Sequence, residues 1–256
     1  LYTGAPAFSG QAAARSGAGL VTVALPREIQ PLLAARLLSL TWLPLPGVDG
    51  KHCRQGGALA RERFGQVDAV LVGPGLTAQE EAAGFLDELL AGPSEGRFVF
   101  DADALNLLAK REGWLAALPR LSVLTPHPGE MSRLTRRSIA EINGNRIATA
   151  RQYAAEWGHV VLLKGAHTVI AHPDGRAAVL PFADPALAKA GSGDVLSGVI
   201  VAMLAQGLAP YEAAVVGGYV HGLAGTLAGR KVGAASTTAD DFVDAIPKSL
   251  KSLYAA

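Results

Sequence analysis

The chain has 256 residues, of which 50% are hydrophobic and 18% charged, and its formal net charge is +1. This near-neutral balance, without a dense basic run, argues against nucleic acid as the main partner. The longest apolar stretch, residues 195–205, is too short to span a bilayer, so no membrane partner is expected. Cys53 is the only cysteine, which excludes a disulfide framework and predicts a reducing, cytoplasmic setting.

In the first 160 residues, short apolar runs alternate with longer stretches of helical periodicity. The runs predict buried strands at 20–25, 69–72, 98–100, 121–124 and 160–163. The periodic stretches predict helices at 6–16, 28–40, 79–90, 103–110 and 139–157. Residues 44–57, with prolines and glycines, are expected to form a surface loop. The alternation is typical of a mostly parallel sheet with helices on both faces.

The last 90 residues begin with a predicted hairpin and then turn purely helical. Runs at 168–171 and 177–180 flank His172-Pro173-Asp174-Gly175, a sequence suited to a tight turn. Helices are predicted at 195–206, 211–228 and 239–253. Glycines within the second of these cost stability unless close packing or a ligand needs the room. With no linker or repeat, residues 1–256 are expected to form a single α/β domain.

Glycines and carboxylates follow two of the predicted strands, at the edge where ligands bind in open α/β sheets. Gly75 belongs to a Gly-Pro-Gly turn after the strand at 69–72, where the backbone could approach a ligand closely. Asp101, Asp103 and Asn106 follow the strand at 98–100. Asp101 could face a ligand or a cation, whereas Asp103 could simply cap the next helix.

Two further strand ends carry basic or imidazole side chains. His127 follows the strand at 121–124 between two prolines, which bar it from a helix interior and hold it extended. This constraint favours a ligand contact over a purely structural role. Lys164 and Gly165 follow the strand at 160–163, where the lysine could neutralise a phosphate or lie solvated at a turn.

The segment Gly191-Ser192-Gly193-Asp194 precedes the apolar helix predicted from residue 195. Glycines there allow a tight turn whose free amides, at the start of a helix, favour a phosphate group. Asp194 beside such an anion seat is suited to accept a proton from a hydroxyl that attacks phosphorus, although it could instead be a helix cap. A P-loop and a Gly-x-Gly-x-x-Gly turn after a strand are both missing from the sequence.

The order of these motifs resembles the ADP-dependent NAD(P)H-hydrate dehydratase family of the ribokinase-like superfamily. The resemblance rests on the segments just described, on Lys164-Gly165-Ala166-His167-Thr168 and on the opening Tyr2-Thr3-Gly4-Ala5-Pro6. It implies a three-layer sandwich and a repair reaction in which a hydrated NADH or NADPH is restored at the expense of ADP or ATP. It also implies Mg²⁺, although the sequence offers no motif that fixes the metal ligands.

The resemblance assigns roles to individual residues. Asp194 would be the catalytic base. The anion seat would be Gly191, Ser192 and Gly193, and the nucleotide would contact Lys164, Gly165, Ala166, His167, Thr168 and Gly193. The hydrated cofactor would contact Ala5, Gly75, His127 and Asp194, with Asp101, Asp103 and Asn106 as further candidates.

Two other functions fit the same residues. A small-molecule kinase of the superfamily, of the hydroxyethylthiazole or hydroxymethylpyrimidine type, would need Asp194 and the anion seat equally. A non-catalytic nucleotide-binding protein would keep the fold but gain nothing from an acid beside phosphate.

The resemblance also bears on the partners and on the start of the chain. It implies a separate epimerase, and a first strand ahead of Tyr2, so the extreme N-terminus is expected to be missing. A homo-oligomer is expected because small residues on the helix at 211–228 would suit contact with another helix, and the resemblance implies a tetramer.

Overall fold

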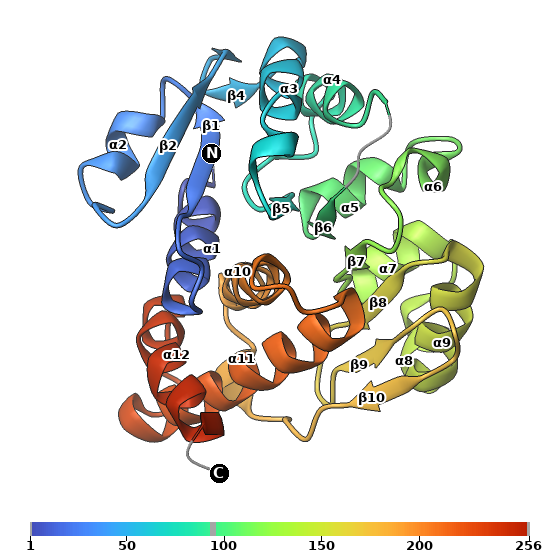
Figure 1. Ribbon diagram of the computed structural model, residues 1–256. Coiled ribbons are helices and arrows are strands. Elements are labelled where there is room, and N and C mark those ends of the chain that lie inside the picture. Colours follow the sequence, from blue (N-terminus) through green and yellow to red (C-terminus); the bar gives the residue numbers. More distant parts are fainter. Residues whose placement is uncertain (1, 93–95, 255–256) are drawn as a thin grey trace.

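A six-stranded sheet lies at the centre of the computed structural model, which describes residues 2–92 and 96–254 (Figure 1). The strand order is β10-β9-β8-β7-β6-β5, and β5 to β8 run parallel while β9 and β10 are antiparallel. The strands are β5 (Ala69–Val72), β6 (Arg97–Phe100), β7 (Val123–Leu124), β8 (Val160–Leu163), β9 (Val169–Ala171) and β10 (Ala177–Val179). The predicted sheet and hairpin are therefore confirmed, with β7 shorter than expected.

Helices cover both faces of this sheet because its strands are apolar on both sides. In β8, Val160 and Leu162 pack under one helical layer, whereas Val161 and Leu163 pack under the other. The first layer consists of α1 (Gly4–Arg15), α10 (Ser192–Ala205), α11 (Pro210–Val232) and α12 (Ala239–Tyr254). The second contains α4 (Glu80–Leu89), α5 (Asp103–Leu108), α6 (Trp114–Ala117), α7 (Pro128–Thr135), α8 (Ile139–Gly144) and α9 (Arg146–Trp157). This arrangement is the predicted three-layer α/β sandwich.

The N-terminal region differs most from the predicted elements. Strand β1 (Thr22–Pro26) pairs in parallel with β2 (Thr41–Leu45) in a separate two-stranded sheet. The helix predicted at 28–40 is wrong, because α2 covers only Gln30–Ala34. The loop predicted at 44–57 is also wrong. It contains the end of β2, β3 (Gly47–Val48), β4 (Lys51–His52) and the start of α3 (Arg54–Arg61), which η1 (Phe64–Gln66) follows.

Two corrections concern the helices around β7. The prediction of one helix at 139–157 is wrong, because α8 and α9 are separated at Asn145, whose backbone leaves the helical conformation and whose side chain accepts a hydrogen bond from the Ala148 amide. Helix α7 was not predicted. It begins with Pro128 at its first position, where a proline costs no helical hydrogen bond.

The surface of α11 at its glycines is covered by the chain's own segment after β10, residues 180–189. This segment includes η2 (Pro185–Leu187). A Cβ on Gly218 would lie 2.7 Å from Leu180, on Gly222 2.2 Å from Phe182 and on Gly225 2.2 Å from Leu187. The small residues thus let this segment lie directly on the helix. The glycine surface from which an oligomer was predicted serves packing within the chain, and the oligomer stays a prediction.

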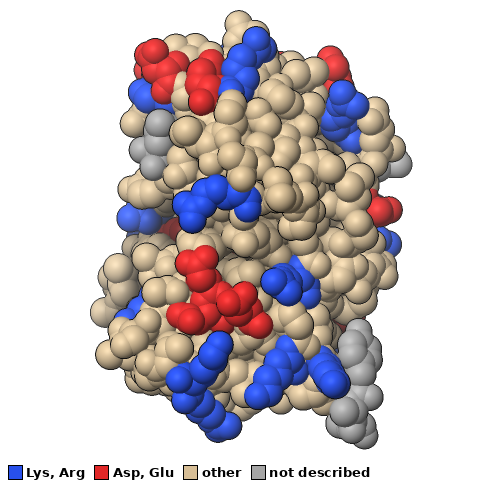
Figure 2. All heavy atoms as spheres, turned by 90° about the vertical axis from the view of Figure 1, so that its left-hand side faces the viewer, with Lys and Arg blue, Asp and Glu red and all other residues tan. Residues whose placement is uncertain are grey.

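Charge on the face formed by α1 and α12 is mixed. Figure 2 shows a group of acidic side chains flanked by basic ones on that face, with no continuous surface of one sign. Among the described residues, no helix combines the length and apolar character needed to cross a membrane.

Candidate active site

The anion seat is formed where α10 begins. The helix starts at Ser192, three residues earlier than predicted, and Gly191 caps it in a left-handed conformation with φ +85°. A Cβ on Gly191 would lie 2.8 Å from the Cβ of Ala239 on α12, so both the turn and the packing require glycine. The first amides of a helix have no carbonyl partner within it. The Ser192 amide donates to the Lys189 carbonyl at 3.1 Å, so the next amide, that of Gly193, is the candidate donor to a phosphate.

Asp194 lies in the first turn of α10, beside this seat. Burial raises the pKa of Asp194 to about 6, and the negative charge of Asp101 adds to the rise while Lys164 opposes it. Ser9 on α1 donates a hydrogen bond to the Asp194 carbonyl at 3.0 Å and so fixes the backbone there. Asp194 is the first acidic residue of the helix but no capping hydrogen bond from it is found, which leaves its carboxylate available for proton transfer.

A buried lysine lies next to the seat. Lys164 follows β8, and its Nζ lies 2.6 Å from Asp101 Oδ1 and 3.5 Å from Glu130 Oε2. Burial alone would lower the pKa of Lys164, but the two carboxylates raise it, so the ammonium stays charged. A Cβ on Gly193 would lie 3.6 Å from Nζ, which brings the positive charge to the amides of the seat. Lysine, amides and helix dipole together favour a phosphate at this point.

Glu130 is almost fully buried, and burial raises its pKa to about 7 although Lys164 acts in the opposite direction. Its rise is consistent with the distances, because Lys164 lies closer to Asp101 than to Glu130. Glu130 also accepts a hydrogen bond from the His127 amide at 2.7 Å. Sequence reasoning did not single out Glu130, although its place three residues after a helix cap is a recognisable signal.

His127 is extended, as its flanking prolines predict, and caps α7. Its Nδ1 accepts hydrogen bonds from the amides of Gly129 (2.9 Å) and Glu130 (3.3 Å), which leaves Nε2 to carry the ring proton. Burial lowers the pKa of His127, helped by Lys164 and Arg133. The side chain remains 50% exposed, and its Nε2 lies 3.4 Å from Glu130 Oε1, so the ring reaches the cavity while staying close to this carboxylate.

The turn after β8 is held by a residue that sequence reasoning missed. Arg146, at the start of α9, donates to the carbonyls of Leu163 at 2.8 Å and Lys164 at 3.1 Å. The Lys164 amide donates to the Pro126 carbonyl at 2.9 Å on the other side. A Cβ on Gly165, whose φ is +141°, would lie 3.0 Å from the guanidinium. These bonds fix the backbone from which the lysine side chain extends.

A cavity of about 570 Å³ opens beside these groups. Its lining includes Lys164, Ser192 and Gly193 from the anion seat and its surroundings, and Phe182 and Leu187 from the segment after β10. Its size lies within the range of small-molecule sites. The full lining comprises His127, Pro128, Lys164, Gly165, Ala166, Thr168, Leu180, Phe182, Ala183, Asp184, Pro185, Leu187, Ala188, Lys189, Ser192, Gly193, Leu196, Gly218, His221 and Gly222.

Most of the predicted nucleotide contacts meet in this cavity. Ala166 and Thr168 line it, but His167 does not, because its amide donates to the Phe182 carbonyl at 2.8 Å and its ring turns towards the Leu180 carbonyl. His127, expected on the side of the hydrated cofactor, lines the same cavity as the nucleotide residues.

A second group of predicted residues lies at the start of α1. A Cβ on Gly75 would lie 2.8 Å from Pro6 and 3.0 Å from the Tyr2 carbonyl, so the turn after β5 touches the start of this helix. Ser9 donates to the Ala5 carbonyl at 3.1 Å as well as to the carbonyl of Asp194. Ala5 and Gly75 therefore lie on the α1 side of Asp194.

Asp103 does not cap α5, which corrects the simpler of its two interpretations. It is the first helical residue, after Ala102 as the cap. Its Oδ2 accepts a hydrogen bond from the Thr77 amide at 3.0 Å, and its Oδ1 accepts one from Asn106 at 3.3 Å. Asp103 and Asn106 thus hold the turn after β5 in place, and Asn106 is itself bonded by Arg133 at 3.0 Å.

The described residues contain no group of three or more His, Cys, Asp or Glu side chains that could hold a metal ion. Asp101, the most buried carboxylate near the seat, is committed to Lys164. Mg²⁺ commonly keeps several waters and binds through substrate phosphates with few protein ligands. The site therefore fits a magnesium ion that arrives with a nucleotide.

The fold is that of a ribokinase-like α/β protein, with Gly191 and Gly193 at the start of α10 and the Asp194 carboxylate beside them. The sequence profile of the NAD(P)H-hydrate dehydratase family matches residues 1–248, and the chain belongs to that family.

Among its relatives, the bifunctional NAD(P)H-hydrate repair enzyme Nnr of Moorella thermoacetica is 42% identical over 98% of the chain and 47% of its own length. The ADP-dependent (S)-NAD(P)H-hydrate dehydratase of Neisseria meningitidis is 34% identical over 91% of the chain and 76% of its own.

A crystal structure of the ADP/ATP-dependent NAD(P)H-hydrate dehydratase from Bacillus subtilis, co-crystallised with ATP and Mg²⁺, superimposes with a TM-score of 0.82. The two chains are 30% identical, and the match covers 98% of this chain and 87% of the other. The chain spans about half the length of the bifunctional relatives it matches.

Proposed function

We propose that the protein restores hydrated NADH or NADPH to the reduced cofactor while converting ADP to AMP and phosphate. The observation that carries the proposal is the half-buried carboxylate of Asp194, with its raised pKa, beside the anion seat and the Lys164 ammonium. A carboxylate in this position repels a phosphate, so its presence calls for a chemical role, and accepting a proton from a hydroxyl is such a role. The hydroxyl of a hydrated nicotinamide ring would supply that proton.

The proposed chemistry has two steps. In the first, Asp194 takes the hydroxyl proton while the hydroxyl oxygen bonds to the terminal phosphorus, and the bond from that phosphorus to the oxygen of the AMP leaving group breaks. In the second, the carbon–oxygen bond of the ring phosphate breaks, phosphate leaves with the electron pair, and the neighbouring carbon loses a proton. A phosphate is a far better leaving group than hydroxide, which is why a nucleotide is consumed.

The nucleotide is proposed to occupy the 570 Å³ cavity, with its terminal phosphate beside Gly193 and its base against Phe182 and Leu187. Lys164 would neutralise developing charge on the phosphoryl group. The hydrated cofactor would approach from the side of Ala5 and Gly75. Its hydroxyl would then lie near Asp194, and the adenine base of the nucleotide would lie on the opposite side of the seat.

Mg²⁺ would enter on the nucleotide, where it neutralises phosphate charge.

The proposal extends to the partners and the compartment of the protein. A separate epimerase would supply the reactive epimer, and the oligomeric state, predicted to be a homo-oligomer or tetramer, remains to be measured. The single cysteine favours the reducing cytoplasm as the setting.

The test is recovery of the nicotinamide absorbance when the protein and Mg²⁺ are added to the hydrate with either ADP or ATP. Recovery accompanied by AMP and phosphate from ADP is the expected result. Failure with both nucleotides, by folded protein that binds ADP, would reject the proposal. A phosphorylated small molecule that accumulates instead would favour the kinase function. Recovery with ATP alone would keep the reaction and overturn the preference for ADP.

A further inference from the structure

A buried histidine that the proposed reaction does not use faces the anion seat. His221 lies in the middle of α11 and is 8% exposed, and its Nε2 is 3.1 Å from the hydroxyl oxygen of Ser192, the first residue of α10. Both residues line the 570 Å³ cavity, as do Lys164 and Gly193. The edge of the imidazole meets the ring of Phe242 from α12, with ring centres 6.1 Å apart. The imidazole is therefore held in one place from two sides.

The hydrogen bond between these residues can carry its proton in two ways. Burial lowers the pKa of His221 to about 4, so the ring is neutral near pH 7 and only one nitrogen bears a proton. If Ser192 donates to Nε2, the serine oxygen presents only lone pairs to the cavity and repels a phosphate. If Nε2–H donates to Ser192, the serine proton is free to point into the cavity and to bond a phosphate oxygen.

Only the second arrangement agrees with the rest of the seat. The groups assigned to the phosphate are donors: the amide of Gly193 and the ammonium of Lys164, 3.6 Å from the Cβ position of Gly193, whereas the Asp194 carboxylate beside the seat is assigned to the substrate hydroxyl. An acceptor among them would weaken the binding of an anion. A hydroxyl donor would add a charge-assisted hydrogen bond, which is stronger than a neutral one.

We propose that His221 is a positioning residue for phosphate recognition, which donates from Nε2 to Ser192 and so directs the serine hydroxyl proton at the terminal phosphate of the nucleotide. This inference rests on the proposed function, since it assumes that a nucleoside diphosphate or triphosphate occupies the cavity. It adds a specificity: Ser192 and His221 recognise the terminal phosphate and leave a nucleoside monophosphate unaffected.

The test is calorimetric titration of the protein with ADP and with AMP. Ser192→Ala and His221→Phe are each expected to weaken ADP by about 10- to 100-fold, the size of one hydrogen bond to a charged group. Binding of AMP should stay within about 3-fold of the wild-type protein. The double variant should bind ADP no more weakly than either single variant, because both substitutions remove the same bond.

A rescue and a control separate positioning from folding. His221→Gln keeps an amide N–H near the place of Nε2 and should recover most of the affinity for ADP. His159, also buried and with a pKa lowered to about 4, lies away from the cavity, where its Nδ1 accepts a hydrogen bond from the Ser122 amide. His159→Phe should cost stability and leave ADP binding unchanged.

Equal weakening of ADP and AMP by His221→Phe, or additive effects in the double variant, would overturn the inference and make His221 a packing residue. Unchanged ADP binding in a folded His221→Phe protein would overturn it too. Failure of the proposed function looks different, since the wild-type protein would then fail to restore the hydrate, whereas failure of this inference leaves wild-type turnover intact and shows only in the ADP and AMP affinities of the variants.

Discussion

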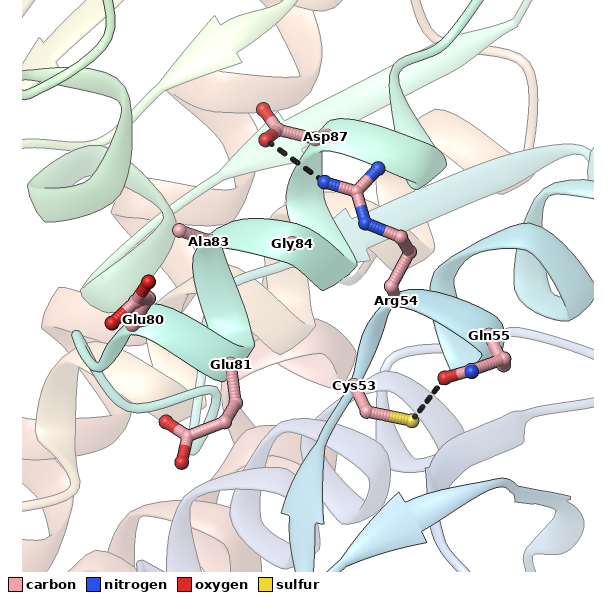
Figure 3. A pocket seen from close by; sticks show the side chains of 8 residues that line it. All are labelled: Cys53, Arg54, Gln55, Glu80, Glu81, Ala83, Gly84 and Asp87. Carbon is pink, nitrogen blue, oxygen red and sulfur yellow. Dashed lines mark hydrogen bonds and ion pairs between the residues drawn. The ribbon is translucent and has the colours of Figure 1, made fainter.

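Two cavities of nearly equal size differ in almost everything else. The cavity beside the anion seat measures about 570 Å³, and a second of about 590 Å³ lies between α3 and α4. Figure 3 shows Arg54 paired with Asp87 in the second cavity, whereas Glu80 and Glu81 have no partner among the side chains drawn. Arg54 also lies 2.6 Å from Glu88, and all three of these paired groups are partly exposed. Charge at this cavity is therefore either paired near the surface or exposed to solvent.

Beside the anion seat, by contrast, charged side chains are largely removed from water and lie where a ligand could contact them. Lys164 is fixed by Asp101 and Glu130 under a helix start, and Asp194 beside it has a raised pKa. Backbone amides and an apolar wall complete the lining. The comparison teaches that volume alone does not identify a site. Buried charge that lacks a partner within the chain, such as the Asp194 carboxylate, does identify one. Such a group costs stability, and folding alone does not require it.

The largest expected effect is on the reaction. Asp194→Asn keeps the shape of the side chain but cannot accept the hydroxyl proton, and general base catalysis is worth about 10²- to 10⁴-fold in rate. We expect kcat for dehydration to fall by that factor while ADP affinity, measured by calorimetry, is nearly kept. A variant that retains more than about a tenth of the wild-type kcat would show that Asp194 is not the base.

The next effect is on stability. Lys164→Ala leaves Asp101, which is 1% exposed, without its cation. Removing one partner of a buried ion pair costs about 3–5 kcal/mol because the other charge remains uncompensated. Urea unfolding should show a loss of that size, together with weaker ADP binding. A loss below about 1 kcal/mol would mean that water reaches Asp101 and that the pair is not buried in solution.

A third effect concerns pH. The pKa of Asp194 is about 6 in the folded protein against its ordinary value of 3.8, so between these limits this side chain binds more protons in the folded state than in the unfolded state. The contribution of Asp194 to the unfolding free energy should therefore fall as pH rises through this window. His52, His159 and His221, whose pKa values burial lowers to about 4, contribute in the opposite direction, so the Asp194 contribution is read as the difference between the wild-type protein and Asp194→Asn. Relative to Asp194→Asn, the deficit should grow from pH 4 to pH 6 and then stay level, reaching about 1–3 kcal/mol.

Thermal or urea unfolding of both proteins across pH 4–8 measures this difference, and the asparagine variant serves as its own control because it lacks the titrating group. A deficit that shrinks with rising pH has the wrong sign and would show that the Asp194 carboxylate is stabilised, not desolvated, by its surroundings.

The smallest effect belongs to the second cavity. Arg54→Ala removes the pairs with Glu88 and Asp87, which are solvent-exposed and worth about 0–1 kcal/mol. We expect little change in stability and none in ADP affinity or in turnover of the hydrate. A substantial loss of ADP binding would show that the nucleotide binds between α3 and α4 and not beside the anion seat.

The sequence predicted the sheet well because buried parallel strands are continuous apolar runs. The strands at 69–72 and 160–163 were placed without error. Helix α3 was missed because Gly56 and Gly57 argue against a helix by propensity. The structure supplies the reason for Gly57: a Cβ there would lie 2.2 Å from the Phe85 carbonyl, so close contact with α4 overrides propensity.

The site was predicted in part for similar reasons. Strand ends indicated Asp101 and Lys164, because parallel strands bring their carboxyl ends to one edge, and the glycines before an apolar helix indicated the seat. No sequence signal connects His221 to Ser192, since the two residues are 29 positions apart on different helices. Arg146 was missed for a second reason. Its partners are backbone carbonyls, which carry no sequence pattern.

The most direct test of the account is a crystal structure of the protein soaked with ADP and Mg²⁺. The account predicts the terminal phosphate at the start of α10, within hydrogen-bond distance of the Gly193 amide, the Ser192 hydroxyl and Lys164, with the base against Phe182 and Leu187. ADP bound between α3 and α4, or bound with its phosphates away from α10, would contradict it.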